Sequence, residues 1–290
     1  MSSTPLRKPL AFAAVLALAA AAGAGLQFLP GETAECAAWE EFLKSAKIVG
    51  DERLGGPDAT TRPHKLTLEK NGRTRFALWK DVDVSEGGLV DAWRYEIAAY
   101  RIDRLLGLDM VPPTVERRVG GVKGSLELWV DDAPNLKKKT ADGTAVPVEK
   151  QAEWNRRAFI QRAFDSLIGN EDRNANNILV TADWRMLLID HSRAFRTKKE
   201  FTERLTFGER GLFRAPDGSP YPLAPLPRLL VDKIRALDAD KIRDAVRPYL
   251  TKNEIAAIVL RAALVVKEIE EIARLRGEDA AFYGEREKAR

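Results

Sequence analysis

A run of polar residues between two apolar segments is the feature that most limits how this chain can fold. Residues 169–177 read Gly-Asn-Glu-Asp-Arg-Asn-Ala-Asn-Asn. They follow a predicted helix at 149–168 and precede two short predicted strands at 178–180 and 186–189. A core explains such a run poorly, because buried polar groups need partners. We interpret it as a site loop; the alternative is a turn whose Asp and Asn side chains only cap backbone groups.

The spacing of three residues in this region indicates a chemistry. Asn177 lies five residues after Asp172, and Asp190 follows the second short strand. Phosphoryl transfer needs a carboxylate that orients the attacking hydroxyl, with an amide and a second carboxylate that hold a metal on the phosphates. The pattern D-x-x-x-x-N followed by an Asp after a strand supplies these groups. We predict Asp172 as the catalytic residue, Asn177 and Asp190 as ligands of Mg²⁺ or Mn²⁺, and ATP as the donor.

These segments resemble those of known kinase families. Asp172-Arg173 through Asn177, with Asp190, resembles the catalytic and metal-binding segments of phosphatidylinositol 3- and 4-kinases and their bacterial relatives. Residues 164–173 look like the corresponding run of secretory-pathway kinases of the four-jointed and Golgi casein kinase type. The resemblance extends loosely over 48–277. It implies a two-lobed, protein-kinase-like α/β (α+β) fold with a small β-rich N-lobe and a mostly helical C-lobe.

The resemblance also implies a phosphate-binding lysine on an N-lobe strand and a glutamate on the next helix. Lys80 ends a predicted strand at 75–80, and Glu96 lies within a predicted helix at 90–106. The two can form the ion pair that aligns such a lysine. Taken without the resemblance, Lys80 would be a solvent-exposed strand end and Glu96 the partner of an arginine of its own helix.

The adenine site is less well marked. A predicted strand at 124–130 would enter the hinge, where backbone groups of Leu128 and Val130 would read the adenine edge; an ordinary core strand is the alternative. Residues 50–56 do not match the G-x-G-x-x-G pattern of a phosphate-covering loop.

The sequence departs from the kinase families at the loop residues. Asn174 stands where many relatives have His, and His191-Ser192 stands where protein kinases have Phe-Gly. Arg193 could steady the loop after Asp190 or contact phosphate, but a surface cation is the interpretation we favour. With His64, His191 completes the histidines of the chain, too few for a histidine-rich metal site.

The remaining pattern outlines two lobes. We place the N-lobe at 37–132, the C-lobe at 147–280 and a solvated connection at 131–146. Other elements expected are a helix at 37–46, a loop at 48–63, a hairpin turning at Asn71-Gly72, a long surface loop at 197–228, and a C-terminal helix at 255–275 that starts with a capping box of Thr251 and Glu254.

The first thirty residues have the pattern of a leader. Arg7 and Lys8 precede an uncharged stretch rich in Ala and Leu, and residues 22–24 supply an A-x-A cleavage site. Residues 1–30 are therefore expected to be a signal peptide or a membrane anchor, which exports the rest of the chain. Cys36 is the single cysteine, so no intramolecular disulfide can form.

The net charge limits the classes of binding partner that this chain is expected to have. The net charge of +4 is the difference between 47 basic and 43 acidic side chains, which does not suggest nucleic-acid binding. We expect a hydroxyl acceptor on a protein or a lipid, with a sugar also open. An exported pseudokinase that acts as a nucleotide-binding or interaction module, and a nucleotidyl transferase on the same fold, are the alternatives.

Overall fold

The computed structural model describes residues 30–55, 63–86 and 89–284. The predicted leader at 1–30 thus lies, but for its last residue, outside the described residues, as does the end of the 50–56 segment. Within the described ranges, none of the helices has the length and apolar character needed to cross a bilayer.

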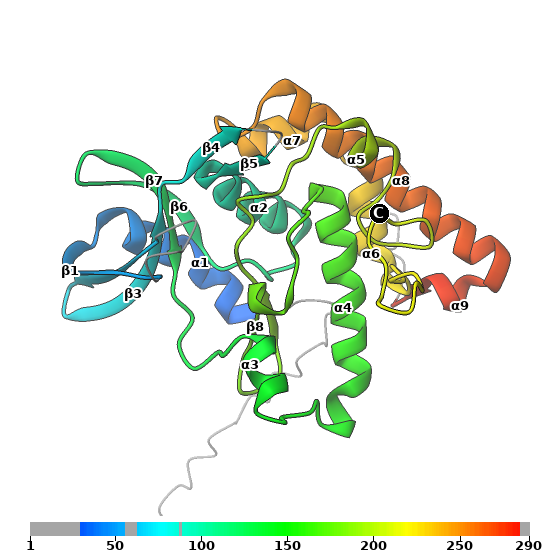
Figure 1. Ribbon diagram of the computed structural model, residues 1–290, viewed down its shortest axis with the longest axis horizontal. Helices are drawn as coiled ribbons and strands as arrows, with labels where there is room; N and C mark the ends of the chain where they lie inside the picture. The colour runs from blue at the N-terminus through cyan, green and yellow to red at the C-terminus, as the bar shows by residue number, and fades with distance from the viewer. Residues whose placement is uncertain (1–29, 56–62, 87–88, 285–290) are drawn as a thin grey trace, which may run out of the picture.

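A five-stranded antiparallel sheet forms one end of the molecule, and most of the helices form the other (Figure 1). Its strands, in spatial order, are β1 (Lys47–Arg53), β2 (His64–Lys70), β3 (Arg73–Lys80), β7 (Val122–Leu128) and β6 (Thr114–Val119). Asn71 and Gly72 join β2 to β3 with φ of 52° and 74°. Positive φ at both residues is what a two-residue hairpin turn requires, so the predicted turn is confirmed.

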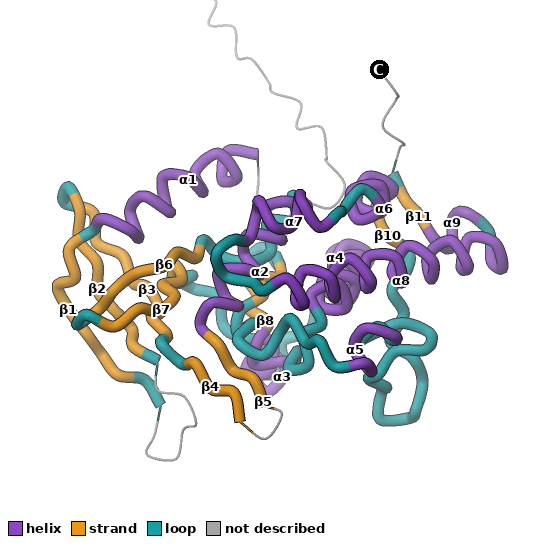
Figure 2. Tube along the Cα trace, turned by 90° about the horizontal axis from the view of Figure 1, so that it is seen from above, coloured by secondary structure: helices purple, strands orange, loops and turns teal. Residues whose placement is uncertain are grey.

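The two faces of this sheet differ: one packs against a helix and the other carries polar side chains. One face packs against α1 (Pro30–Ser45), which lies across the strands in Figure 2. That interface buries apolar side chains from both sides: Phe42, Leu43, Leu66, Leu68, Ala77, Trp79 and Leu126. Because side chains alternate along a strand, the opposite face carries Lys80 and its cross-strand partner Ser125.

Residues 47–53 form a strand, so the loop predicted at 48–63 is wrong at its start. β1 is an edge strand that pairs only with β2 among the described strands, and its register shifts between Ile48 and Gly50. Backbone hydrogen bonds to one neighbour can hold an edge strand in place even where few of its side chains are buried. In β1 most of the side chains are exposed. The glycine and charged residues that indicated a loop are therefore compatible with a strand here.

A small hairpin, β4 (Asp83–Glu86) and β5 (Leu89–Ala92), precedes α2 (Trp93–Leu106). The helix predicted from residue 90 thus begins three residues later, because residues 90–92 pair with β4. The strand predicted at 124–130 is β7, which ends at Leu128, so Val130 lies beyond it.

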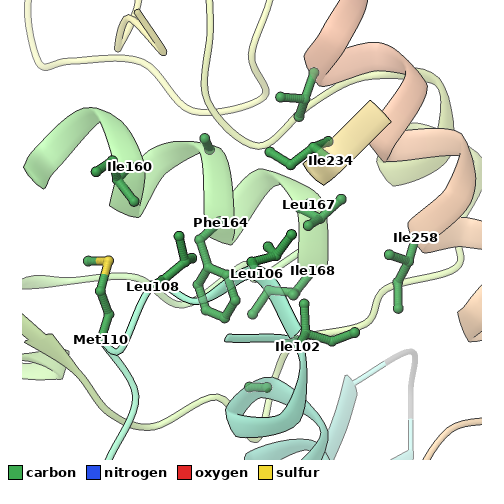
Figure 3. Packing of buried hydrophobic residues seen from close by; sticks show 14 of the residues in the cluster. Ile102, Leu106, Leu108, Met110, Ile160, Phe164, Leu167, Ile168, Ile234 and Ile258 are labelled. Atoms are coloured by element: carbon green, nitrogen blue, oxygen red, sulfur yellow. The ribbon is translucent and has the colours of Figure 1, made fainter. Parts of the chain in front are cut away.

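The helices after α2 are α3 (Leu136–Ala141), α4 (Val148–Ile168), α5 (Lys199–Glu203), α6 (Arg228–Arg235), α7 (Ala239–Val246), α8 (Lys252–Arg276) and α9 (Glu278–Ala281). Of these, α4, α6, α7 and α8 supply, together with α2, most of the buried side chains of the main core. Figure 3 shows Phe164, Leu167 and Ile168 of α4 packed toward Leu106 and Ile258. This packing fixes the end of α4, from which the polar loop begins. The short strands β8 (Ile178–Val180) and β9 (Met186–Leu188) pair after that loop, and β10 (Leu226–Pro227) pairs with β11 (Phe282–Tyr283).

Two segments predicted as solvated are more ordered than expected. The connection at 131–146 contains α3, whose first turn is capped by the Asn135 side chain accepting from the Lys138 backbone N–H. The loop at 197–228 contains α5 and is held down by buried apolar side chains, among them Phe201, Phe207 and Leu223. The capping box of Thr251 and Glu254 is confirmed.

Candidate active site

A buried ion pair beneath the polar loop sets its shape. Asp165, in the last turn of α4, is fully buried and accepts from Arg173 Nε at 2.9 Å and from Asn170 Nδ2 at 2.9 Å. Gln161, one turn earlier on α4, also donates to Asp165. The carboxylate is thus neutralised and hydrogen-bonded, as a buried charge must be. The loop from Asn170 to Arg173 is therefore attached to the helix end.

Arg173 also connects the loop to the strands that follow. Its Nη1 donates to the carbonyls of Asn177 and Ile189, and its Nη2 lies 2.8 Å from His191 Nε2. Since Arg can only donate, Nε2 must accept and the ring proton lies on Nδ1. Burial lowers the pKa of His191, which keeps this neutral form. One guanidinium therefore holds Asn177, Ile189 and His191 in place.

The structure brings Asp172 and Asn177 together. Asn177 Nδ2 donates to the backbone carbonyl of Asp172 at 2.9 Å, and Asn177 lies in a single 3₁₀ turn (Ala175–Asn177). Asn174 caps that turn and also lies 3.3 Å from Asp172 Oδ1. The Asp172 side chain keeps 38% of its surface exposed. The two asparagines of the loop therefore hold Asp172 in place, while part of its carboxylate faces solvent.

Lys80 meets two carboxylates from different parts of the chain. Its Nζ lies 2.6 Å from Glu96 Oε1 and 2.7 Å from Asp190 Oδ1. The other Glu96 oxygen accepts from the His191 backbone N–H at 2.7 Å. Glu96 therefore pairs with Lys80, not with an arginine of its own helix, and Lys80 is 12% exposed rather than a solvated strand end.

The charges at this cluster support one another. Burial alone would lower the pKa of the Lys80 ammonium, but the carboxylates of Asp190 and Glu96 outweigh burial and raise it above its ordinary value. Burial would raise the pKa of Glu96, yet the charge of Lys80 and the His191 side chain hold it below its ordinary value. Both groups are charged at neutral pH.

Two backbone features serve this cluster. Gly124 lies opposite the end of β3, where a Cβ would come 2.3 Å from the carbonyl oxygen of Lys80. Only glycine lets β7 approach so closely. Asp190 adopts a left-handed φ of 60°, which is uncommon outside glycine and is often found at functional sites.

The residues predicted to read the adenine edge lie at and just beyond the end of β7. The Leu128 backbone N–H donates to the Pro113 carbonyl at 2.9 Å, so only its carbonyl could contact a base. Glu127, which the sequence did not single out, is buried on the Lys80 face of the sheet. Burial, followed by the charge of Glu96, raises the pKa of Glu127 well above its ordinary range.

The oxygen atoms of Asp190 and Asn177 that could bind a metal suit a hard divalent cation. Lys80 and Ser192 both donate to Oδ1 of Asp190, and Asn177 uses its Nδ2 toward Asp172. Asp190 Oδ2 and the amide oxygen of Asn177 are thus the atoms left for a metal, and Mg²⁺ and Mn²⁺ prefer such oxygens. No group of three His, Cys, Asp or Glu that could hold an ion occurs among the described residues. Phosphate oxygens and water would have to complete the coordination, as is usual for Mg²⁺ bound to nucleotides.

Sequence reasoning missed Asp165, Arg173 and His191 as organisers of the site. A signal was present for Asp165, which is a charged residue in the apolar run at the end of α4. Arg193 was interpreted as a surface cation, but it lies 3.5 Å from Asp91 and 3.9 Å from Asp172. Its partners come from β5 and the polar loop, which no sequence spacing relates to it.

Solved structures of low sequence identity share this architecture. The structure of hydra Fam20 with sugar matches with a TM-score of 0.60 and 15% identity, covering 86% of this chain and 92% of that one. The Helicobacter pylori proinflammatory kinase CtkA matches with a TM-score of 0.52 and 12% identity, covering 81% and 96%. No known family model matches the sequence, and no curated protein does. The chain thus has the protein-kinase-like α/β fold expected from its sequence.

Proposed function

We propose that this protein is a kinase that transfers the γ-phosphoryl group of ATP, with Mg²⁺ or Mn²⁺, to a hydroxyl acceptor. The observation that supports this most directly is the contact of one buried lysine, Lys80, with both Glu96 and Asp190. In protein kinases, phosphate binding needs a strand lysine paired with a helix glutamate, and a nearby aspartate that holds the metal.

Each residue has a separate role in this proposal. Lys80 would hold the α- and β-phosphates, with Glu96 keeping its ammonium in position. Asn177 and Asp190 would hold the metal, which neutralises the charge of the phosphates when bound. Asp172, whose side chain keeps 38% of its surface exposed, would orient the acceptor hydroxyl. It would take the hydroxyl proton as the new bond to phosphorus forms and the bond from phosphorus to the leaving ADP oxygen breaks. Leu128 and Val130 would contact the adenine edge through their backbone.

The acceptor and the location extend the proposal. A hydroxyl on a protein or a lipid is the acceptor we propose. Because the hydra Fam20 structure contains a sugar, sugar hydroxyls belong in the test panel. The leader pattern of residues 1–30 supports export, with the domain outside the cytoplasm.

Titration calorimetry of nucleotide, followed by mass analysis of products, tests this function. We expect ATP to bind only with Mg²⁺ or Mn²⁺ present, and an acceptor to gain the mass of one phosphoryl group. Binding without any product would indicate a pseudokinase, and a gain of the nucleotidyl mass would indicate nucleotidyl transfer. Absence of metal-dependent nucleotide binding would contradict the proposal outright.

A further inference from the structure

Arg193 lies between two carboxylates that come from distant parts of the chain. Its Nε is 3.5 Å from Asp91 Oδ2 on β5, and its Nη1 is 3.9 Å from Asp172 Oδ2 in the polar loop. A guanidinium presents several donors in a rigid plane, so it can face two carboxylates at once. About a third of the Arg193 side chain, 32%, remains exposed.

The buried carboxylate of Asp91 needs the Arg193 guanidinium beside it. Its side chain is 8% exposed, and its Oδ1 is buried without a hydrogen-bond partner. A buried carboxylate needs a nearby cation. Among the described residues, Arg193 is the cation that forms an ion pair with Asp91, so Asp91 restrains where the guanidinium can lie.

The backbone on either side of Arg193 is also fixed. The Ala92 N–H donates to the Ser192 carbonyl at 2.9 Å, and the Phe195 N–H donates to the Ile168 carbonyl at 2.7 Å. These bonds attach the segment to β5 on one side and to the end of α4 on the other. The guanidinium therefore projects from a rigid base toward Asp172.

Asp172 is contacted from both sides as a result. Asn174 Nδ2 lies 3.3 Å from Oδ1, and Arg193 lies toward Oδ2. Without Arg193, Asp172 would lose the attraction on one oxygen and would share the region with the uncompensated charge of Asp91.

We infer that Arg193, held by Asp91, is a positioning residue that fixes the Asp172 carboxylate for the acceptor hydroxyl. This inference rests on the proposed kinase function. It differs from a nucleotide-binding role, since Arg193 pairs with Asp172, the residue proposed to orient the acceptor, and among the described residues forms no ion pair with the proposed metal ligand Asp190.

Steady-state kinetics of Arg193→Ala, Arg193→Lys and Asp91→Asn test the inference. We expect Arg193→Ala to lower kcat about 10- to 100-fold, because small misplacements of a catalytic group cost this much. The KM for ATP and the affinity for Mg·ATP should stay within about twofold. Arg193→Lys should recover part of kcat, and Asp91→Asn should lose less than Arg193→Ala. Arg118→Ala, an exposed change on β6, is the matched control.

A double-mutant cycle with Asp172→Asn decides whether the effect passes through Asp172. Arg193→Ala should have almost no further effect in that background, since the positioned group is already absent. An equal loss in both backgrounds, or a parallel loss of Mg·ATP affinity, would overturn the inference. If Arg193→Ala fails to fold, Arg193→Lys takes its place in the cycle. A wild-type protein without any turnover overturns the proposed function as well, whereas normal turnover by Arg193→Ala overturns only this inference.

Discussion

Lys80 and Glu96 lie where bulk water solvates neither charge. The Glu96 side chain is 2% exposed, and its two oxygens are used by Lys80 and by the His191 N–H. Removing one member of such a pair leaves the other buried and unpaired, at a cost of about 3–5 kcal/mol. Loss of Lys80 should therefore destabilise the folded state as well as weaken the proposed nucleotide binding, which the strand-end position of Lys80 in the sequence did not suggest.

We predict that Lys80→Ala loses Mg·ATP affinity and also lowers the thermal midpoint of the ligand-free protein. The double variant Lys80→Ala with Glu96→Gln should regain part of the midpoint, because glutamine carries no charge to compensate. It should regain no nucleotide affinity. Differential scanning calorimetry and titration calorimetry measure the two quantities. Unchanged affinity in Lys80→Ala would show that the lysine is only structural.

Asp172 and Asp190 should respond differently to substitution. Asp190→Ala removes a proposed metal ligand and should abolish metal-dependent nucleotide binding together with activity. Asp172→Ala should keep most Mg·ATP affinity but lose turnover by about 10²- to 10⁴-fold, the usual scale for a positioned acid-base group. Asn177→Ala should fall between them, since water can partly replace an amide ligand. Small, equal effects of Asp172→Ala and Asp190→Ala would mean that the loop is only a capped turn.

At this scale the sequence predicted residues with a local pattern and missed those defined by tertiary contacts. Asp172 and Asn177 were found because they lie five positions apart in one loop. Arg193 was misjudged because its partners, Asp91 and Asp172, are 102 and 21 positions earlier in the chain. Burial, which decides whether a charged residue is a surface cation or part of a site, is not encoded in spacing.

Among the elements, α8 begins with a device that the sequence did reveal. The Thr251 hydroxyl accepts from the Glu254 N–H, and Glu254 Oε2 accepts from the Thr251 N–H at 2.6 Å. The same carboxylate accepts from the hydroxyl of Tyr95 on α2. The cap thus connects the helical core to the helix that carries Glu96.

Thr251→Ala should lower the free energy of unfolding by about 1 kcal/mol, because the first turn of α8 loses its side-chain acceptor. Mg·ATP affinity should not change, since the cap makes no contact with the site. Thr251→Ser keeps the hydroxyl and is the matched control. Chemical denaturation checks the prediction, and equal stability of the alanine variant and the wild type would contradict it.

Elements with strong periodicity or a turn signature were predictable, and elements that depend on a neighbour were not. The hairpin at Asn71-Gly72 and the helix ending at Ile168 follow from local chemistry. β1 was missed because its side chains are mostly exposed and its stability comes from backbone pairing with β2. The segment 197–228 was taken for a surface loop because its buried residues have no regular spacing.

Across the whole molecule, the order of elements predicted two lobes, because most strands precede the helical half and only a short hairpin interrupts that half. The kinase-like fold itself followed from the resemblance of residues 164–177 and Asp190 to known kinase families. The contacts that hold the helical half together were not visible in the sequence. Arg261 on α8 is fully buried and donates to the carbonyls of Leu167 and Arg196, which joins α8 to the end of α4 and to the segment after Asp190. Burial lowers the pKa of this guanidinium to about 9, and its hydrogen bonds within the described residues go to backbone carbonyls.

The junction between α2 and β6 gives the folded molecule a pH dependence. Asp103 is fully buried, and its Oδ1 accepts from the backbone N–H groups of Met110 and Val111. Burial raises the pKa of this carboxyl to about 8, despite those two bonds. In the unfolded chain an aspartate titrates near its ordinary value of about 3.9. Between these values the folded state binds more protons than the unfolded state.

The stability contributed by Asp103 is therefore full below about pH 4 and declines as pH rises toward about 8. Asp103→Asn cannot titrate, so its free energy of unfolding should fall less steeply than that of the wild type between about pH 5 and pH 8. The difference should be on the order of 1–3 kcal/mol over that window. Urea denaturation at several pH values measures both slopes, with Asp131→Asn in the exposed connection as the control for a lost charge. Parallel curves for the wild type and Asp103→Asn would show that Asp103 is ionised in the folded protein, and the two backbone N–H bonds would then be sufficient to stabilise a buried carboxylate.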